Sequence, residues 1–270
     1  MKAAPAANAP ALGPPSAEAR LTTASHFADL LALTKPRLNL LVLLTTLAGL
    51  YLAAPEGVPA SLLVHTLVGS ALVAGGAAAL NQVMEHRTDG LMRRTSRRPV
   101  PAGRLGISES TWFGVFLSVA GIGELWLGAN IVAAAVAAVT HLSYVLAYTP
   151  LKTRTSLSTL VGAVPGALPP VIGWSAVTGD VSLPALILFG IVFFWQMPHF
   201  LAIAWMYRDD YANAGIPLLP VTEPDGRRTG RQALLYAAAL WPVSIMPAAV
   251  GLADVPYSLV ATLLGLAFIA

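Results

Sequence analysis

The sequence contains no cysteine and little charge, and each shortage excludes a class of protein. Without cysteine, the chain forms neither a disulfide framework nor a thiolate metal site, and it has no thiol nucleophile. Only 11% of its 270 residues are charged and 56% are hydrophobic, and the mean hydropathy is +0.69. Soluble domains carry roughly 25% charged residues. The composition therefore excludes an ordinary soluble domain and predicts an integral membrane protein.

The N-terminal segment also lacks a feature, the apolar core of an export signal. Residues 1–25 are rich in alanine and proline, whereas a cleaved signal peptide needs a continuous apolar stretch. We therefore expect residues 1–25 to form a disordered cytoplasmic tail. Residues 26–270 are expected to form a single transmembrane domain.

Long apolar runs fill that domain. A membrane-spanning helix needs about 20 predominantly apolar residues, and this criterion predicts an all-α, multi-pass bundle of transmembrane helices. The last run stops at Ala270 while it is still apolar, so we expect the chain to be truncated at its C-terminus. The eight predicted spans are residues 38–54, 60–83, 108–128, 130–148, 157–178, 182–206, 231–252 and 256–270.

Basic residues are absent from alternate loops. All 16 lysines and arginines lie on the N-terminal side of the predicted membrane. Basic loops stay in the cytoplasm, so we expect a multi-pass protein of a bacterial inner membrane with a cytoplasmic N-terminus. The net charge of +3 and the pI near 9.4 could suit nucleic acid, but membrane orientation already explains them. We therefore predict no nucleic-acid partner. The loops without basic residues lie around residues 55–59, 128–130, 175–182 and 253–256.

The densest group of polar residues follows the second predicted span. Asn81, Glu85 and Asp89 recur at four-residue intervals in the stretch NQVMEHRTDGLMRRTSRRPVPAGR. On a helix, these side chains share one face, with a rise of about 6 Å between neighbours. Mg²⁺ prefers oxygen ligands and is commonly held by one or two carboxylates together with substrate phosphates. The spacing therefore predicts a Mg²⁺ site at the end of a membrane helix.

Arginines follow these residues within one short loop. Guanidinium groups such as those of Arg94, Arg97 and Arg98 remain charged, and each can donate two parallel hydrogen bonds to phosphate oxygens. Together with the metal, they would hold a diphosphate and stabilise it as it departs. The alternative is a loop whose arginines only set membrane orientation and whose acids are their solvated partners. The four-residue spacing favours the diphosphate site.

Four stretches of the sequence resemble one family of membrane enzymes. The segment NQVMEHRTDGLMRRTSRRPVPAG is similar to the first aspartate-rich motif of the UbiA superfamily of membrane prenyltransferases. The PHF and DDYANAGIPLLP segments favour its protohaem IX farnesyltransferase branch over quinone-forming relatives. The other similar stretches are LTKPRLNLLVLL at 33–44, YTPLKTRTSLSTLVGAVPGALPPVIGW at 148–174 and FWQMPHFLAIAWMYRDDYANAGIPLLPV at 194–221.

The resemblance covers roughly residues 30–250 and carries expectations about fold and activity. It implies a UbiA-like bundle of nine helices around a central cavity, one more helix than the runs predict. It also implies Mg²⁺-dependent transfer of farnesyl from farnesyl diphosphate to a vinyl group of haem B, which gives haem O. The sequence does not indicate whether the protein associates with a haem A synthase.

The resemblance also extends to a later acidic motif. In the superfamily its carboxylates usually stand several residues apart, whereas here Asp209 and Asp210 are adjacent and Asn213 follows. We expect Asp209 and Asp210 to be ligands of a second metal ion. The alternative is a solvated loop in which they pair with Arg208.

Three histidines lie within predicted spans. His199, in the segment WQMPHF, is a candidate for binding haem because imidazole is a common ligand of haem iron. The alternative is a hydrogen bond to a neighbouring helix, where Pro198 frees a backbone carbonyl. His65 and His141 have no motif around them, so we expect packing or an interhelical hydrogen bond for each.

Aromatic and basic residues meet at the end of the fourth predicted span. Tyr144, Tyr148 and Lys152 recur at four-residue intervals, and Pro150 is expected to end the helix. Lys152 could contact the diphosphate, and the ring face of Tyr148 could stabilise an allylic cation. The alternative is that both residues anchor the helix at the membrane interface.

Three other functions remain open at the level of sequence. A prenyltransferase acting on a quinone precursor such as 4-hydroxybenzoate would use the same diphosphate site. A transporter would distribute polar residues through the depth of the membrane, whereas here they concentrate at one end. A haem-binding protein without catalysis would need His199 but neither Glu85 nor Asp89.

Overall fold

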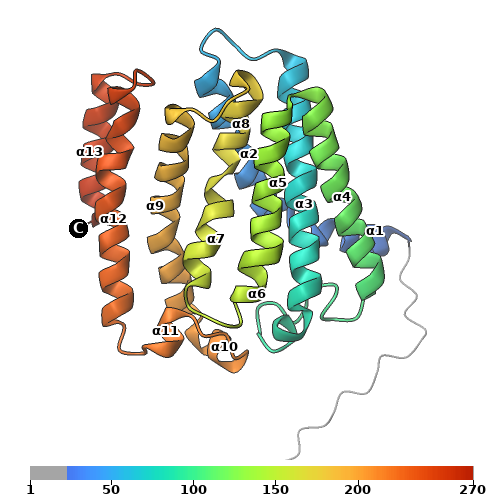
Figure 1. The fold of residues 1–270 in the computed structure, drawn as a ribbon. Helices are drawn as coiled ribbons and strands as arrows, with labels where there is room; N and C mark the ends of the chain where they lie inside the picture. Colours follow the sequence, from blue (N-terminus) through green and yellow to red (C-terminus); the bar gives the residue numbers. More distant parts are fainter. Residues whose placement is uncertain (1–22, 270) are drawn as a thin grey trace, which may run out of the picture.

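The computed structural model describes residues 23–269, and all of its regular structure is helical (Figure 1). The predicted all-α fold is thus confirmed for this part of the chain. The helices are α1 Thr23–Leu33, α2 Pro36–Ala53, α3 Ala60–Gly90, α4 Ile107–Gly128, α5 Ile131–Leu142, the π-helix η1 Ser143–Tyr148, α6 Thr149–Leu151, α7 Ser158–Ala167, α8 Pro169–Thr178, α9 Leu183–Met206, α10 Arg208–Asn213, α11 Leu219–Thr222, α12 Arg227–Ala249 and α13 Val255–Ile269.

The predicted spans correspond to these helices. Within the described residues, 7 helical segments are long and apolar enough to cross a membrane, and α13 is a shorter apolar helix of 15 residues. Two spans are interrupted, since the fourth is α5, η1 and α6 in succession and the fifth is α7 and α8. The second span is longer than predicted, because α3 continues to Gly90. The motif residues therefore extend a membrane helix rather than follow one.

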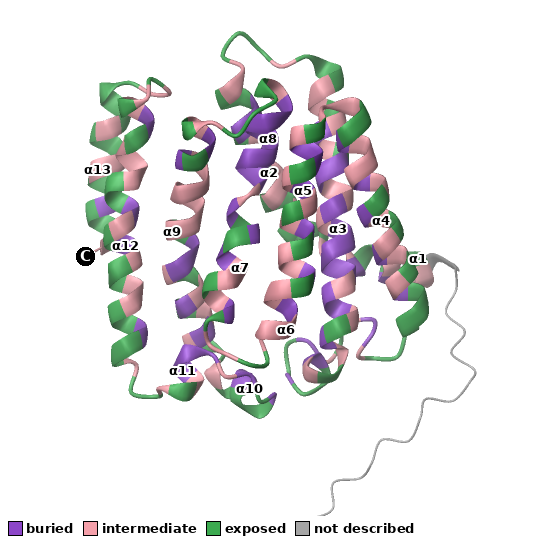
Figure 2. Ribbon diagram, viewed as in Figure 1, coloured by how far each residue is buried: buried purple, intermediate pink, exposed green. Residues whose placement is uncertain are grey.

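Helices α1, α2, α4, α5 and α8 pack against α3. Small residues allow the close approaches. A side chain at Gly76 would collide with Ser118 of α4, and one at Gly173 of α8 would collide with the Thr46 carbonyl of α2. Small residues at such crossings are typical of helices packed in membranes. Many helical residues are exposed, as the green segments of Figure 2 show, and these include large apolar side chains such as Trp112, Phe116 and Leu127, as expected for a lipid-facing surface.

The connections at one end of the bundle carry the basic residues, and we call this the basic end. It is the lower end in Figure 1, where α6, α10, α11 and the loop of residues 91–106 lie close together. The cluster Met92, Ala204, Tyr211, Ala214, Ile216 and Leu218 packs this loop against α9 and α10. Residues that are far apart in sequence therefore meet at the basic end.

Helix α1 was not predicted from the sequence. Its Asp29 accepts hydrogen bonds from Arg104 Nε at 3.0 Å, and His26 lies 2.7 Å from Glu109. These contacts fasten α1 to the loop of residues 91–106 and to the start of α4. The predicted disordered tail of residues 1–25 lies outside the described residues as far as residue 22, and α1 begins at Thr23. The predicted truncation concerns Ala270, which also lies outside them.

Candidate active site

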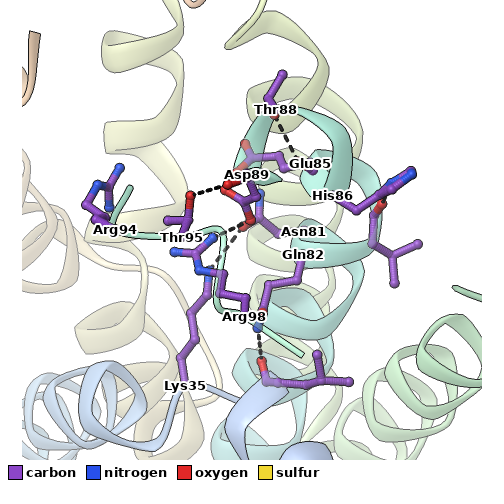
Figure 3. Close-up of polar contacts among 12 residues, drawn as sticks. Lys35, Asn81, Gln82, Glu85, His86, Thr88, Asp89, Arg94, Thr95 and Arg98 are labelled. Carbon is purple, nitrogen blue, oxygen red and sulfur yellow. Dashed lines mark hydrogen bonds and ion pairs between the residues drawn. The ribbon is translucent and has the colours of Figure 1, made fainter. Parts of the chain in front are cut away.

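Asn81, Glu85 and Asp89 lie on the last three turns of α3 and are buried, with exposed fractions of 2%, 6% and 0% (Figure 3). Helical periodicity places residues four apart on one face. Here that face turns into the protein rather than toward solvent. Two carboxylates in such a place need compensation, because removing a charge from water is costly unless it is paired.

Three cations from three different segments supply that compensation. Arg98 Nη1 donates to Asp89 Oδ2 at 2.6 Å, and Lys152 Nζ donates to Glu85 Oε2 at 2.9 Å. Lys35 Nζ donates to Asn81 Oδ1 at 3.1 Å (Figure 3). We call these residues, together with Asn81, Glu85 and Asp89, the polar cluster. Its charges are balanced by residues up to 67 positions apart in sequence.

Lys35 was not predicted as a site residue. It ends the turn between α1 and α2 in a left-handed conformation with φ of 50°. Gln82 of α3 holds this turn in place, since its Nε2 donates to the Leu33 carbonyl at 2.8 Å. Burial, together with the positive charge of Arg98, lowers the pKa of Lys35 to about 7. The only signal in the sequence was the stretch LTKPR, in which a basic residue directly precedes an apolar helix.

The loop after α3 is folded so that Arg98 returns to the helix. Thr95, which is 1% exposed, donates from Oγ1 to the Asp89 carbonyl at 2.8 Å. This bond turns the chain back over the end of α3, so that a residue nine positions after Asp89 reaches its carboxylate. Arg97 is exposed on the same loop, and its carbonyl accepts from Arg104. Its contact with a diphosphate stays a prediction.

The polar cluster has free oxygen ligands for a cation. Glu85 Oε1 and Asp89 Oδ1 are buried and have no hydrogen-bond partner among the described residues. An unpaired buried carboxylate oxygen is costly, and two such oxygens beside an amide oxygen are the donor set that Mg²⁺ prefers. No group of three His, Cys, Asp or Glu residues in the described range could hold a metal alone. The cluster therefore fits an ion that shares its coordination with phosphate oxygens.

Arg94 connects the same loop to α10. Its Nη2 donates to Tyr211 Oη at 2.9 Å, and its guanidinium carbon lies 5.3 Å from the ring centroids of both Tyr207 and Tyr211. This is cation–π geometry. A pocket of about 470 Å³ opens beside it, lined by Arg93, Arg94, Met206, Tyr207, Asp209, Asp210 and Asn213.

Asp209 and Asp210 lie in this pocket rather than in the polar cluster. The Asp209 side chain is 92% exposed, and its nearest cation is Arg208 at 3.9 Å. Asp210 is half-buried. Both face the pocket that Arg94 lines, but exposure leaves water to satisfy them. A second metal site at these two residues stays a prediction.

His199 faces a different, apolar pocket of about 480 Å³. It is exposed on α9, and its ring stacks on Trp195 with centroids 5.4 Å apart and planes at 16°. Alanine, leucine and phenylalanine residues of α12 and α13 complete the pocket. Of the other two histidines, His65 forms the expected interhelical hydrogen bond, since its Nδ1 lies 2.8 Å from Glu124 Oε1.

The fourth span ends at Leu151, one position after the Pro150 that was expected to end it. The π-helix η1, which was not predicted, directly precedes this end. The rings of Tyr144 and Tyr148 lie 5.2 Å apart, and the ring of Tyr148 covers Gly162 of α7. Lys152 follows directly and reaches Glu85. This segment therefore brings aromatic faces and a cation to the polar cluster together.

Comparison with known proteins identifies the family to which this membrane bundle belongs. The pattern of the UbiA prenyltransferase family matches residues 42–270. The chain belongs to this family. The protoheme IX farnesyltransferase of Solibacter usitatus is 47% identical over 250 residues, which cover 89% of this chain and 86% of that protein. The enzyme of the same name from Myxococcus xanthus is 45% identical, over 94% of this chain and 84% of that protein.

Solved structures share the fold of this UbiA chain. A UbiA homolog from Archaeoglobus fulgidus bound to GPP and Mg²⁺ has a TM-score of 0.73 at 14% identity, over 89% of this chain and 86% of that one. A digeranylgeranylglyceryl phosphate synthase has a TM-score of 0.76 at 16% identity, over 91% of this chain and 85% of that one. At such identities the likeness is one of fold.

Proposed function

We propose that the protein transfers the farnesyl group of farnesyl diphosphate to a vinyl group of haem B, with addition of water, and so makes haem O. The observation that carries this proposal is the polar cluster, in which two buried carboxylate oxygens lack partners within residues 23–269 and lie beside three cations. Relatives at 44–47% identity that carry the name protoheme IX farnesyltransferase support the choice of substrates.

The α3 residues Asn81, Glu85 and Asp89 would hold Mg²⁺ through their oxygens. When bound, the ion supplies Lewis-acid stabilisation of the negative charge that develops on the leaving diphosphate. Arg98 and Lys152 neutralise the carboxylates in its absence. Both cations lie within reach of any phosphate oxygens beside those carboxylates. Arg94 presents a further guanidinium to the neighbouring pocket.

Ionisation breaks the bond between C1 of the farnesyl chain and the diphosphate oxygen, and the electron pair leaves with pyrophosphate. The allylic cation that remains needs an environment without water. Tyr148, with its neighbour Tyr144, offers ring faces that stabilise a cation without attacking it. The haem vinyl group then attacks C1. Water adds to the new cation beside the porphyrin and loses a proton, which leaves the hydroxyl of haem O.

His199 is the proposed haem ligand. Its support is an imidazole that lines an apolar pocket of about 480 Å³ beside Trp195, since haem iron commonly takes an axial imidazole. We also propose that the protein lies in a bacterial inner membrane with its basic end in the cytoplasm, on the rule that basic loops stay inside. Farnesyl diphosphate would then reach the polar cluster from the cytoplasm.

Purified protein with farnesyl diphosphate, Mg²⁺ and either haem B or 4-hydroxybenzoate tests the proposal directly. We expect haem O, identified by chromatography and mass, only in the reaction that contains haem B. Prenylation of the benzoate alone would instead assign a quinone precursor as acceptor. Haem binding without product, in the presence of both substrates, would favour a non-catalytic haem protein.

Removal of the Tyr211 hydroxyl is expected to raise the KM for farnesyl diphosphate about tenfold, while kcat changes less than about twofold. The reason is that a hydrogen bond to a charged group contributes about 1.5–3 kcal/mol. The variant is Tyr211→Phe, which keeps the ring over Arg94 but frees its guanidinium to turn. Tyr257→Phe is the matched control, because Tyr257 Oη donates to the Ser244 carbonyl at 2.9 Å, in the packing of α12 and α13. Equal KM values in both variants would contradict a role of Tyr211 in holding Arg94.

A further inference from the structure

A buried threonine connects the polar cluster to the π-helix η1. Thr149 is 4% exposed, and its Oγ1 accepts a hydrogen bond from Asn81 Nδ2 at 3.2 Å. The same hydroxyl donates to the Tyr144 carbonyl at 2.9 Å. Asn81 is therefore held from two sides, by Lys35 at its oxygen and by Thr149 at its nitrogen.

The partners of this chain of bonds leave Asn81 only one orientation. In its ammonium form Lys35 carries donors alone, so the atom that then faces it is the amide oxygen, and Nζ donates to Asn81 Oδ1 at 3.1 Å. The Tyr144 carbonyl only accepts, so the Thr149 proton points to it and a lone pair of Oγ1 remains for the amide N–H. If the amide were turned over, its N–H would face an ammonium group. Thr149 therefore determines where Asn81 Oδ1 points.

That oxygen faces the charges of the polar cluster. It lies 3.1 Å from Lys35 Nζ, and it belongs to the same face of α3 as Glu85 and Asp89, whose carboxylates accept from Lys152 and Arg98. An amide oxygen has two lone pairs, so Oδ1 can accept from Lys35 and still bind a cation. It completes a set of three oxygens with the unpartnered Glu85 Oε1 and Asp89 Oδ1.

The π-helix explains why a threonine reaches this position. The Thr149 backbone N–H bonds to the Tyr144 carbonyl, five residues back, and the Thr149 hydroxyl bonds to the same oxygen. Because a π-helical turn contains more residues than an α-helical turn, the residues after it are rotated about the helix axis relative to a regular α-helix. Single π-helical turns cost stability and are frequent at functional sites. Here the turn brings Thr149 to α3.

We propose that Thr149 is a positioning residue that orients the Asn81 amide for metal binding, and that η1 serves to place its hydroxyl. The inference rests on the proposed function, because it assigns a support to one ligand of the proposed ion. Without the hydroxyl, the Asn81 N–H has no acceptor in its buried site, and the amide turns to find one. Its oxygen then leaves the ligand set.

The test compares Thr149→Val, which keeps the shape but removes the hydroxyl, with Thr149→Ser, which keeps the hydroxyl. Mn²⁺ replaces Mg²⁺ as the probe, and the signal of free Mn²⁺ in electron paramagnetic resonance reports binding to detergent-solubilised protein with inorganic pyrophosphate present. Loss of a bond that orients a metal ligand typically costs 10–100-fold in affinity. We expect about tenfold weaker Mn²⁺ binding for Thr149→Val, and recovery to within about threefold for Thr149→Ser.

Thr140→Val is the matched control. Thr140 lies on the same span, and among the described residues its hydroxyl bonds only its own helix, through Oγ1 to the Val136 carbonyl at 2.7 Å. The Thr140→Val variant should bind Mn²⁺ with the affinity of the wild type. In assays of haem O formation, Thr149→Val should raise the Mg²⁺ concentration for half-maximal rate about tenfold, while the rate at saturating Mg²⁺ falls much less.

The inference would be overturned if Thr149→Val bound Mn²⁺ with the affinity of the wild type and had an unchanged melting temperature. Equal weakening in Thr149→Ser would also overturn it, because the hydroxyl would then be irrelevant. Failure of the proposed function is a separate result, since the wild type itself would then make no haem O from farnesyl diphosphate and haem B.

Discussion

Exchanging Asp89 for asparagine is expected to lower kcat for haem O formation about 100-fold to 1,000-fold, the range typical for loss of one electrostatic group in an active site. Asp89 is fully buried, with Oδ2 bonded to Arg98 at 2.6 Å and Oδ1 unpartnered among the described residues. Asparagine keeps the shape of the side chain. It removes the charge that would hold a metal ion and presents either an N–H or an uncharged oxygen to the guanidinium.

Asp180→Asn is the matched control, because Asp180 is an exposed acid in the loop between α8 and α9, at the other end of the bundle. Its rate should stay within about twofold of the wild type, as is usual for an exposed substitution away from any site. Haem O is quantified by chromatography with saturating substrates, and the melting temperature is recorded for each variant. A rate within threefold of the wild type in Asp89→Asn would remove Asp89 from the proposed metal ligands.

The features of this protein that depend on local pattern could be predicted from its sequence. A membrane helix must be long and apolar, so the apolar runs located the spans within a few positions, except at the end of α3, which continues to Gly90. Helical periodicity put Asn81, Glu85 and Asp89 on one face, and the structure has them buried together on α3. Both inferences need only the chain's own spacing. They do not depend on how the helices pack.

The features that were missed depend on tertiary contacts. Lys35 and Thr149 reach Asn81 from positions 46 and 68 residues away, and spacing along the chain does not predict either contact. The π-helix cannot be read from SYVLAY, because its wide turn is stabilised by contacts with α3, α5 and α7. Helix α1 has only 11 residues and is too short for a span, and ion pairs with Arg104 and Glu109 hold it. Arginine density likewise did not distinguish Arg98, which reaches a carboxylate, from the exposed Arg97.

Replacing Lys152 with methionine is expected to lower both the stability and the activity of the protein. Lys152 and Glu85 form a pair with side-chain exposures of 13% and 6%. Removal of one partner from a buried pair leaves an uncompensated charge and costs about 3–5 kcal/mol. In detergent and without substrates, the melting temperature should fall by roughly 5–10 °C. The rate of haem O formation should fall about 100-fold, since the proposed diphosphate site loses a cation.

The double variant Lys152→Met/Glu85→Gln separates these two effects. Replacing both members of a buried pair by uncharged groups is often close to neutral, so the melting temperature should return to within a few degrees of the wild type. Activity should not return, because both the cation for the diphosphate and a carboxylate for the metal are then absent. If the pair contributed only to stability, the double variant would recover its activity together with its melting temperature. Activity in that variant would therefore contradict the proposed use of the Lys152–Glu85 pair in ionising the diphosphate.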